Sequence, residues 1–175
     1  IPPTDSSEPS STYPTIPDPY NGLIGEIETG DLGPNVTYAL DSVGTLLVLG
    51  HGPMYDYMDA NGNYIPGMYN PLGSAEITSI HIQEGITSIG GGVFAFKEGF
   101  TYITLPSTIE RVGDYAFAYC RNLGGTVSLR NATEIGAYAF TQTAILHANL
   151  GDNLESIGEG AFQGHFCGIG ECVYQ

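Results

Sequence analysis

Residues 103–123 read ITLPSTIERVGDYAFAYCRNL, and three other segments of the chain repeat this pattern in the same register. Each copy contains an aliphatic residue followed by glycine, and a phenylalanine four positions after the glycine. The phenylalanines recur every 22 or 23 residues, at Phe94, Phe117, Phe140 and Phe162. A repeat of this length predicts a solenoid, because each copy can bury its apolar side only against its neighbours.

Each copy begins with two apolar residues separated by one position, which is the spacing of a strand that buries one face. These pairs are Ile80/Ile82, Ile103/Leu105, Val127/Leu129 and Ala148/Leu150. We therefore predict one short strand per coil, paired in parallel with the coils on either side. The glycine predicts a tight turn, where a side chain would clash or φ is positive. Ala116, Phe117, Cys120 and Leu123 have the spacing of one or two helical or 3₁₀ turns. The predicted fold class is a strand-rich α/β solenoid of about four coils of 22–23 residues.

The residues before the repeat divide into two regions. Residues 1–21 are rich in proline and serine and predict a disordered linker. In residues 22–76, NVTYAL and TLLVLG flank the turn sequence DSVG, which is typical of a β-hairpin, so this region is predicted to be a β-rich N-terminal cap. Residues 77–175 form the predicted solenoid, and Val173, 23 residues after Leu150, is expected to begin a fifth strand or a closing cap.

The charge of the chain restricts its partners. The net charge is −15, and the only basic residues are Lys97, Arg111, Arg121 and Arg130. Nucleic acids and anionic membranes need basic patches, so neither is expected as a partner. No stretch approaches the roughly 20 apolar residues of a membrane span, so no membrane insertion is predicted for this segment. Because residue 1 is Ile rather than Met, we expect that an upstream segment such as a signal peptide was removed.

The unit I-x-L-P-x-x-I-x-x-[IV]-G-x-x-A-F-x-x-C-x-x-L at residues 103–123 resembles the BspA-like leucine-rich repeats of bacterial cell-surface proteins. The preceding segment NVTYALDSVGTLLVLGHGPMYDY resembles the β-rich unit that often precedes such repeats. The resemblance covers residues 33–165. It implies secretion or anchoring at the cell surface and, as in several members, adhesion to host or bacterial proteins. It implies no catalytic motif.

Cys120 and Asp114 stand close together, but the repeat argues against a reactive thiol. The positions equivalent to Cys120 hold Lys97, Thr143 and His165, which indicates a variable position near the edge of the coil. Asp114 is predicted at a solvent-facing turn. A nucleophilic cysteine needs an electropositive neighbourhood that lowers its pKa, and none is evident. We therefore predict that Cys120 serves packing.

Other candidate sites are incomplete. Asp59, Asn61 and Asn63 match the start of a calcium loop, but Tyr64 replaces the required glycine and Asn70 the bidentate glutamate, so a turn is predicted. The four histidines form no ligand set, and the glycine run 90–92 lacks a phosphate-loop lysine. We predict no cofactor, no metal and no enzymatic activity.

The two C-terminal cysteines, Cys167 and Cys172, are separated by a segment with two glycines, which lets the chain fold back. They can form a disulfide in an oxidising compartment. A zinc site is disfavoured, because the CxxC spacing and a second ligand pair are both missing.

The predicted binding site is the outward face of the strand ladder, because alternate side chains of a strand point to opposite sides. Its residues are small or hydrogen-bonding: Ser79, His81, Tyr102, Thr104, Thr126, Ser128, Arg130, His147 and Asn149. We predict adhesion to, or binding of, a host or bacterial surface protein by a monomeric extracellular module. The alternatives are an ordinary solvated face on a structural spacer, and a glycan-binding or hydrolytic domain that uses the tyrosine-rich residues 55–69.

Overall fold

The computed structural model describes residues 20–164. Nearly all of the predicted linker, the fifth strand at Val173, His165 and the Cys167–Cys172 pair lie outside the described residues. The described part contains strands and turns but no helix, so the predicted strand-rich solenoid is confirmed and its helical component is wrong. The strands are β1 (Glu28–Gly33), β2 (Val36–Leu40), β3 (Thr45–Gly50), β4 (Gly52–Pro53), β5 (Ser79–Ile82), β6 (Ile86–Ile89), β7 (Arg111–Val112), β8 (Gly124–Leu129), β9 (Glu134–Ile135), β10 (Ala144–Leu150) and β11 (Ser156–Ile157).

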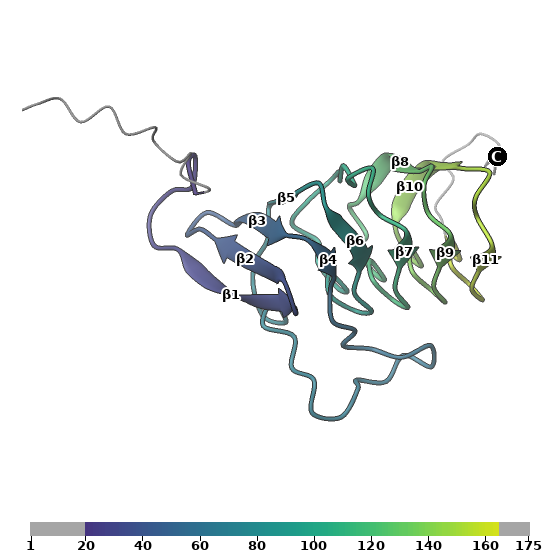
Figure 1. Ribbon diagram of the computed structural model, residues 1–175, viewed down its shortest axis with the longest axis horizontal. Coiled ribbons are helices and arrows are strands. Elements are labelled where there is room, and N and C mark those ends of the chain that lie inside the picture. Colours follow the sequence, from purple (N-terminus) through teal and green to yellow (C-terminus); the bar gives the residue numbers. More distant parts are fainter. Residues whose placement is uncertain (1–19, 165–175) are drawn as a thin grey trace, which may run out of the picture.

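The strands form three sheets (Figure 1). One sheet has the order β1-β2-β3-β5, with antiparallel pairs except for the parallel pair β3/β5. A second sheet consists of the parallel strands β8 and β10. The third is a parallel sheet of five strands in the order β11-β9-β7-β6-β4, which cross the solenoid side by side.

The hairpin predicted from NVTYAL and TLLVLG is confirmed as β2 and β3, which pair from Val36↔Gly50 to Leu40↔Leu46. Its turn is organised by Asp41, whose Oδ1 accepts hydrogen bonds from the backbone N–H groups of Val43 (3.0 Å) and Thr45 (2.7 Å). Burial raises the pKa of this carboxyl, but the backbone donors outweigh burial and hold the pKa below its usual value. The folded turn therefore favours the ionised form of Asp41.

Each coil contributes two strand positions, whereas the sequence pattern predicted one. The predicted apolar pairs lie on β5, β8 and β10, but Ile103 and Leu105 lie on an extended segment outside any strand. The second position, just before each repeat glycine, forms β6, β7, β9 and β11 of the five-stranded sheet. The more continuous of the two ladders was thus missed.

The segment predicted as one or two helical or 3₁₀ turns forms turns in which every second N–H group bonds to the next coil. The N–H groups between them, of Ala116, Ala118 and Cys120, donate to carbonyls three residues earlier, which is the bonding of a 3₁₀ turn. Tyr115, Phe117 and Tyr119 donate to carbonyls of residues 137, 139 and 141, at N···O distances of 2.8–2.9 Å. An α-helix would instead direct these donors to carbonyls four residues earlier in the same chain segment. Tyr115 also has φ 56°, outside the helical region.

The four repeat phenylalanines stack through the centre of the solenoid. Neighbouring ring centroids are 5.4 Å, 5.2 Å and 5.4 Å apart, and Phe94, Phe117 and Phe140 are fully buried. Such pairs contribute about 0.5–1.5 kcal/mol each beyond the area that they bury. The repeat glycines allow the close approach of the chain: a Cβ on Gly113 would lie 2.5 Å from the backbone nitrogen of Gly91. The close approach of the two coils, and not a positive φ, explains why residue 113 is a glycine.

Candidate binding face

We call the outward side of β5, residues 102–105, β8 and β10 the strand face. Eight of the nine predicted site residues are exposed, and the ninth, Ser79, is half-buried. The side chain of Tyr102 is 65% exposed, whereas its neighbour Ile103 is buried. The register of β8 and β10 places His147 beside Thr126 and Asn149 beside Ser128, in the order that the repeat predicted.

The strand face is hollowed near the ends of its strands. A hollow of about 340 Å³ is lined by residues from successive coils. Thr104, Ser128 and Arg130 of the predicted set line it, together with Glu84, Ser107 and Asn131. Glu84 Oε1 and Oε2 accept hydrogen bonds from the backbone N–H and the hydroxyl of Ser107, both at 2.9 Å.

Glu84 and Ser107 were not predicted from the sequence. They stand 23 residues apart, so their contact repeats the period of the solenoid, and that spacing is the signal that could have found them.

The four basic side chains have different environments. Arg111 contacts Asp56 and Glu134, and Arg121 Nε lies 3.8 Å from Glu98 Oε1. Lys97 is buried, and its ammonium donates to three backbone carbonyls of residues 72–75. Within residues 20–164, the guanidinium of Arg130 has no hydrogen-bond or ion-pair partner. It is therefore available to a ligand on the strand face.

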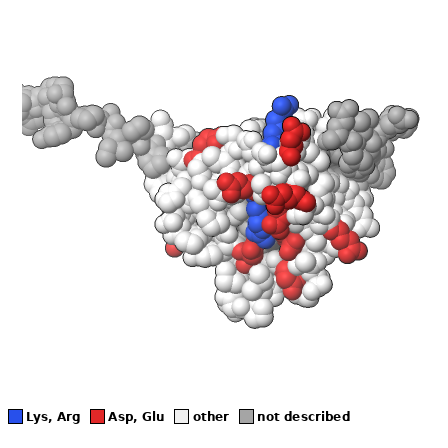
Figure 2. Space-filling model, turned by 45° about the vertical axis from the view of Figure 1, so that its right-hand side comes forward, with Lys and Arg blue, Asp and Glu red and all other residues white. Residues whose placement is uncertain are grey.

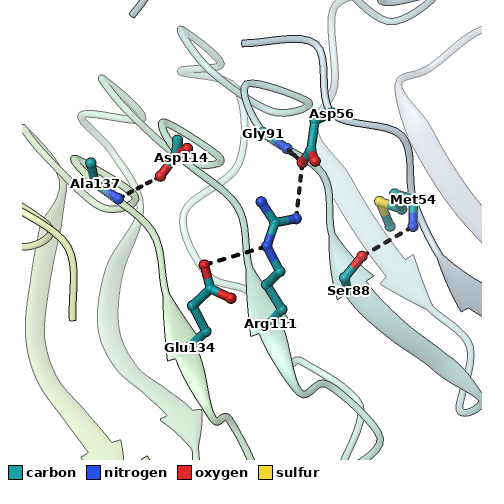
Figure 3. A network of polar contacts seen from close by, with 8 residues as sticks. All are labelled: Met54, Asp56, Ser88, Gly91, Arg111, Asp114, Glu134 and Ala137. Carbon is teal, nitrogen blue, oxygen red and sulfur yellow. Dashed lines mark hydrogen bonds and ion pairs between the residues drawn. The ribbon is translucent and has the colours of Figure 1, made fainter. Parts of the chain in front are cut away.

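The five-stranded sheet presents a different surface, which we call the acidic face. It includes Glu110, Glu134 and Glu155 on or next to its strands, and Figure 2 shows acidic side chains gathered around few basic ones. At its centre Arg111 Nη1 lies 3.0 Å from Asp56 Oδ1, and Arg111 Nε lies 3.7 Å from Glu134 Oε1 (Figure 3). Desolvation lowers the pKa of Arg111, but these carboxylates outweigh it and raise the pKa.

Asp56 and Asp114 bind backbone groups of neighbouring coils. Asp56 Oδ1 accepts the N–H of Gly91, and Asp114 Oδ1 accepts the N–H of Ala137, both at 2.7 Å (Figure 3). Asp114 was predicted at a solvent-facing turn. Asp114 is half-buried instead, and its carboxylate accepts the backbone N–H of Ala137 from the next coil.

Cys120 is fully buried, so its predicted packing role agrees with the structure and its predicted place near the coil edge is wrong. Its thiol donates to the carbonyl of Phe94, with an Sγ···O distance of 3.0 Å. Burial raises the pKa of the Cys120 thiol to about 12, far from that of a reactive thiolate. Lys97 and Thr143 at the equivalent positions are also buried and bind backbone carbonyls.

The loop that resembled a calcium site is closed by its own backbone. Asp59 Oδ1 accepts hydrogen bonds from the N–H groups of Asn61 (2.9 Å) and Asn63 (3.0 Å), as in an Asx turn. In the described part of the chain, no group of three or more His, Cys, Asp and Glu side chains is placed to hold a metal ion.

The tyrosine-rich residues 55–69 serve both core and surface. Tyr57 is buried, whereas Tyr64 and Tyr69 are 67% and 90% exposed.

Strands stacked in coils of a 22–23-residue repeat, with parallel pairing from coil to coil, define a leucine-rich-repeat type of solenoid. The family described as "BspA type Leucine rich repeat region (6 copies)" matches residues 72–168. The chain belongs to this family. No curated protein matches the chain.

Two solved structures are similar to the chain. A leucine-rich repeat protein from Eubacterium ventriosum is 24% identical, with a TM-score of 0.54, over 76% of this chain and 44% of that one. A leucine rich cell surface protein from Faecalibacterium prausnitzii is 19% identical, with a TM-score of 0.40, over 79% of this chain and 52% of that one. The first likeness supports the fold. This chain thus spans about half the length of these proteins or less. Among residues 20–164, no helix has the length and apolar character needed to cross a membrane.

Proposed function

We propose that this chain is a secreted or cell-surface module that binds a protein through the strand face and catalyses no reaction. The observation that supports the proposal is the row of exposed, hydrogen-bonding side chains in register on β8 and β10. A chain with a net charge of −15 has carboxylates on much of its surface, yet none of the nine predicted face residues is acidic. Solenoids use such extended surfaces to bind partners.

The proposal includes a finer architecture. Residues 77–164 form about four coils of 22–23 residues, and residues 22–76 act as a β-rich cap on the first coil. The parallel pair β3/β5 supports the cap, because it joins the hairpin to the first coil through the same sheet. The module is a monomer that binds no nucleic acid, in keeping with its acidic composition.

The test is a binding measurement on the full chain against immobilised extracellular-matrix proteins and purified bacterial surface proteins. We expect at least one partner to bind with micromolar or better affinity, and Tyr102→Ala combined with His147→Ala to weaken it about tenfold or more. The matched control is Glu110→Gln with Glu155→Gln on the acidic face, which should leave the affinity unchanged. Equal affinity of the strand-face variant and the wild type would contradict the assignment of the binding site to this face.

A structural spacer is the second candidate. It is favoured by the observation that the chain spans only 44% of the similar protein from Eubacterium ventriosum, so these coils could position another part of a longer protein. Absence of any partner in the binding measurement would favour the spacer. Binding to a glycan array that is lost when Tyr64 and Tyr69 are replaced by alanine would instead favour a glycan-binding domain.

A further inference from the structure

The hollow on the strand face contains Arg130, the one Lys or Arg side chain without a partner in residues 20–164. We propose that this hollow binds the carboxylate of an acidic side chain on the protein partner. The inference rests on the proposed function and adds the chemistry of the ligand. Arg130 follows directly after β8, so this strand sets its position on the face.

The hollow is large enough to admit an acidic side chain, and its lining suits one. Its volume of about 340 Å³ lies at the low end of the range of about 300–1,000 Å³ found for ligand sites. Thr104 and Ser128 are exposed beside Arg130 and offer hydroxyl donors. Leu105, Pro106 and Leu129 supply aliphatic walls against which the methylene groups of a glutamate or aspartate side chain pack.

The chain leaves Arg130 free for this role. The guanidinium of Arg111 and the ammonium of Lys97 bind groups of this protein, and Arg121 lies 3.8 Å from Glu98. A guanidinium binds a carboxylate through two parallel N–H···O bonds, which are among the strong hydrogen bonds of proteins. Repulsion from the net charge of −15 is screened over about 8 Å at physiological salt, so a short contact of this kind can still form.

Glu84 also lines the hollow, but its carboxylate is hydrogen-bonded to Ser107, another residue of the lining. Its two carboxylate oxygens accept the N–H and the hydroxyl of Ser107, each at 2.9 Å. No ion pair joins it to Arg130 among the described residues. Glu84 therefore holds the wall of the hollow and leaves the guanidinium unpaired.

The lining favours an acidic side chain over an acidic sugar. Sugar rings are commonly bound against aromatic ring faces, and none of the described residues that line the hollow is aromatic. The aliphatic walls instead match the short methylene stem of an aspartate or glutamate. A carboxylate-bearing glycan is thus the competing ligand that the experiment must distinguish.

The test is an NMR titration of the full-length, ¹⁵N-labelled chain at neutral pH and low salt. The probe is a capped pentapeptide of alternating serine and glutamate, and its control replaces glutamate with glutamine. We expect the acidic peptide alone to shift the Arg130 Nε–H signal and the amides of Thr104 and Ser128. Arg130→Gln should weaken binding about tenfold, and Arg121→Gln, which removes another exposed guanidinium, should leave it unchanged. Raising the salt to about 1 M, where the Debye length is about 3 Å, should weaken binding further.

Three outcomes would overturn the inference: no shift at Arg130, equal binding of the glutamine peptide, or unchanged binding by Arg130→Gln. Tighter binding of a glucuronate-containing disaccharide at the same signals would overturn the assignment to a protein side chain. These experiments distinguish a failure of the inference from a failure of the proposed function. If the Tyr102/His147 variant loses the protein partner and Arg130→Gln does not, the strand face remains the binding surface and the carboxylate site is refuted.

Discussion

The strand face and the acidic face are built by the same repeat, yet they differ in continuity and in charge. The acidic face lies over five parallel strands in one sheet and holds Arg111 between two carboxylates. The strand face is interrupted at residues 102–105, and its one arginine, Arg130, has no partner in the described residues. On the acidic face Arg111 pairs with Asp56 and Glu134, and Asp56 and Asp114 accept backbone N–H groups. On the strand face the guanidinium of Arg130 is left for water or a ligand.

The difference teaches where stability and recognition reside in this solenoid. The continuous sheet joins the coils through backbone pairs and through Asp56 and Asp114, which accept N–H groups of neighbouring coils. The interrupted ladder leaves room for the hollow at Thr104 and Ser128. Substitutions on the acidic side should therefore act mainly on stability, and those on the strand face mainly on binding. Two pairs of variants test this division, and a third pair tests an exception to it, the hydrogen-bonded carboxylate of Glu84 at the hollow.

The largest expected difference is between two glycines, one beside each ladder. Gly113→Ala places a Cβ 2.5 Å from the backbone nitrogen of Gly91, where the coils cannot separate without breaking hydrogen bonds. We expect a loss of about 3 kcal/mol in the free energy of unfolding. Gly125→Ala on β8 meets no atom within 4 Å but retains φ 74°, so we expect a loss of about 1 kcal/mol. Urea unfolding measures both, and equal losses would contradict the division.

A smaller difference is expected between the two arginines. Arg111→Gln removes the cation from Asp56 and Glu134 and should cost about 1 kcal/mol, with a smaller loss at high salt because the site is partly exposed. Arg130→Gln breaks no side-chain hydrogen bond or ion pair within residues 20–164 and should leave the free energy of unfolding unchanged. Thermal unfolding at two salt concentrations makes the comparison. A destabilising Arg130→Gln would show that this arginine serves the fold.

The smallest expected effect is a dependence on pH at Glu84. The hydrogen bonds from Ser107 hold the pKa of Glu84 below its usual value in the folded chain. A carboxyl with a depressed folded pKa stabilises the protein above its unfolded pKa, and this contribution is lost as the pH falls through the folded value. Glu84→Gln should therefore flatten the acid side of the stability profile. Glu155→Gln, on the acidic face, is the matched control, and an equal change in both variants would refute the role of Ser107.

The residues that were predictable from sequence are those with a long periodic signal. Alternation in Val127/Leu129 and Ala148/Leu150 predicted the strands and the outward side chains of β8 and β10, and their register agrees. The strands of the acidic face were not predicted, because β7, β9 and β11 have only two residues each, which is too short to show a period of two. Arg111 and its partners were missed for the same reason.

The hollow and the absence of a helix could not be predicted from one coil, because both depend on contacts between neighbouring coils. Glu84 and Ser107 meet only when neighbouring coils stack, so the sequence of one coil gives no signal for the hollow. The apolar spacing from Ala116 to Leu123 suits a helix, but Phe117 donates its N–H to Ala139 of the next coil. Hydrogen bonds to the next coil alternate with bonds to carbonyls three residues earlier, and periodicity within one coil cannot reveal that pattern.

The hydrogen bonds between coils also determine how the solenoid would respond to force. They join one coil to the next, as in the bonds from Tyr115 and Phe117 to residues of the following coil, so they run roughly along the long axis of the solenoid. A force along that axis acts directly on these hydrogen bonds, so the last coil can unfold before its neighbour does. Each coil of 22–23 residues would release about 75 Å of chain as it extends. The solenoid would therefore lengthen in steps of nearly equal size, because one coil unfolds at a time.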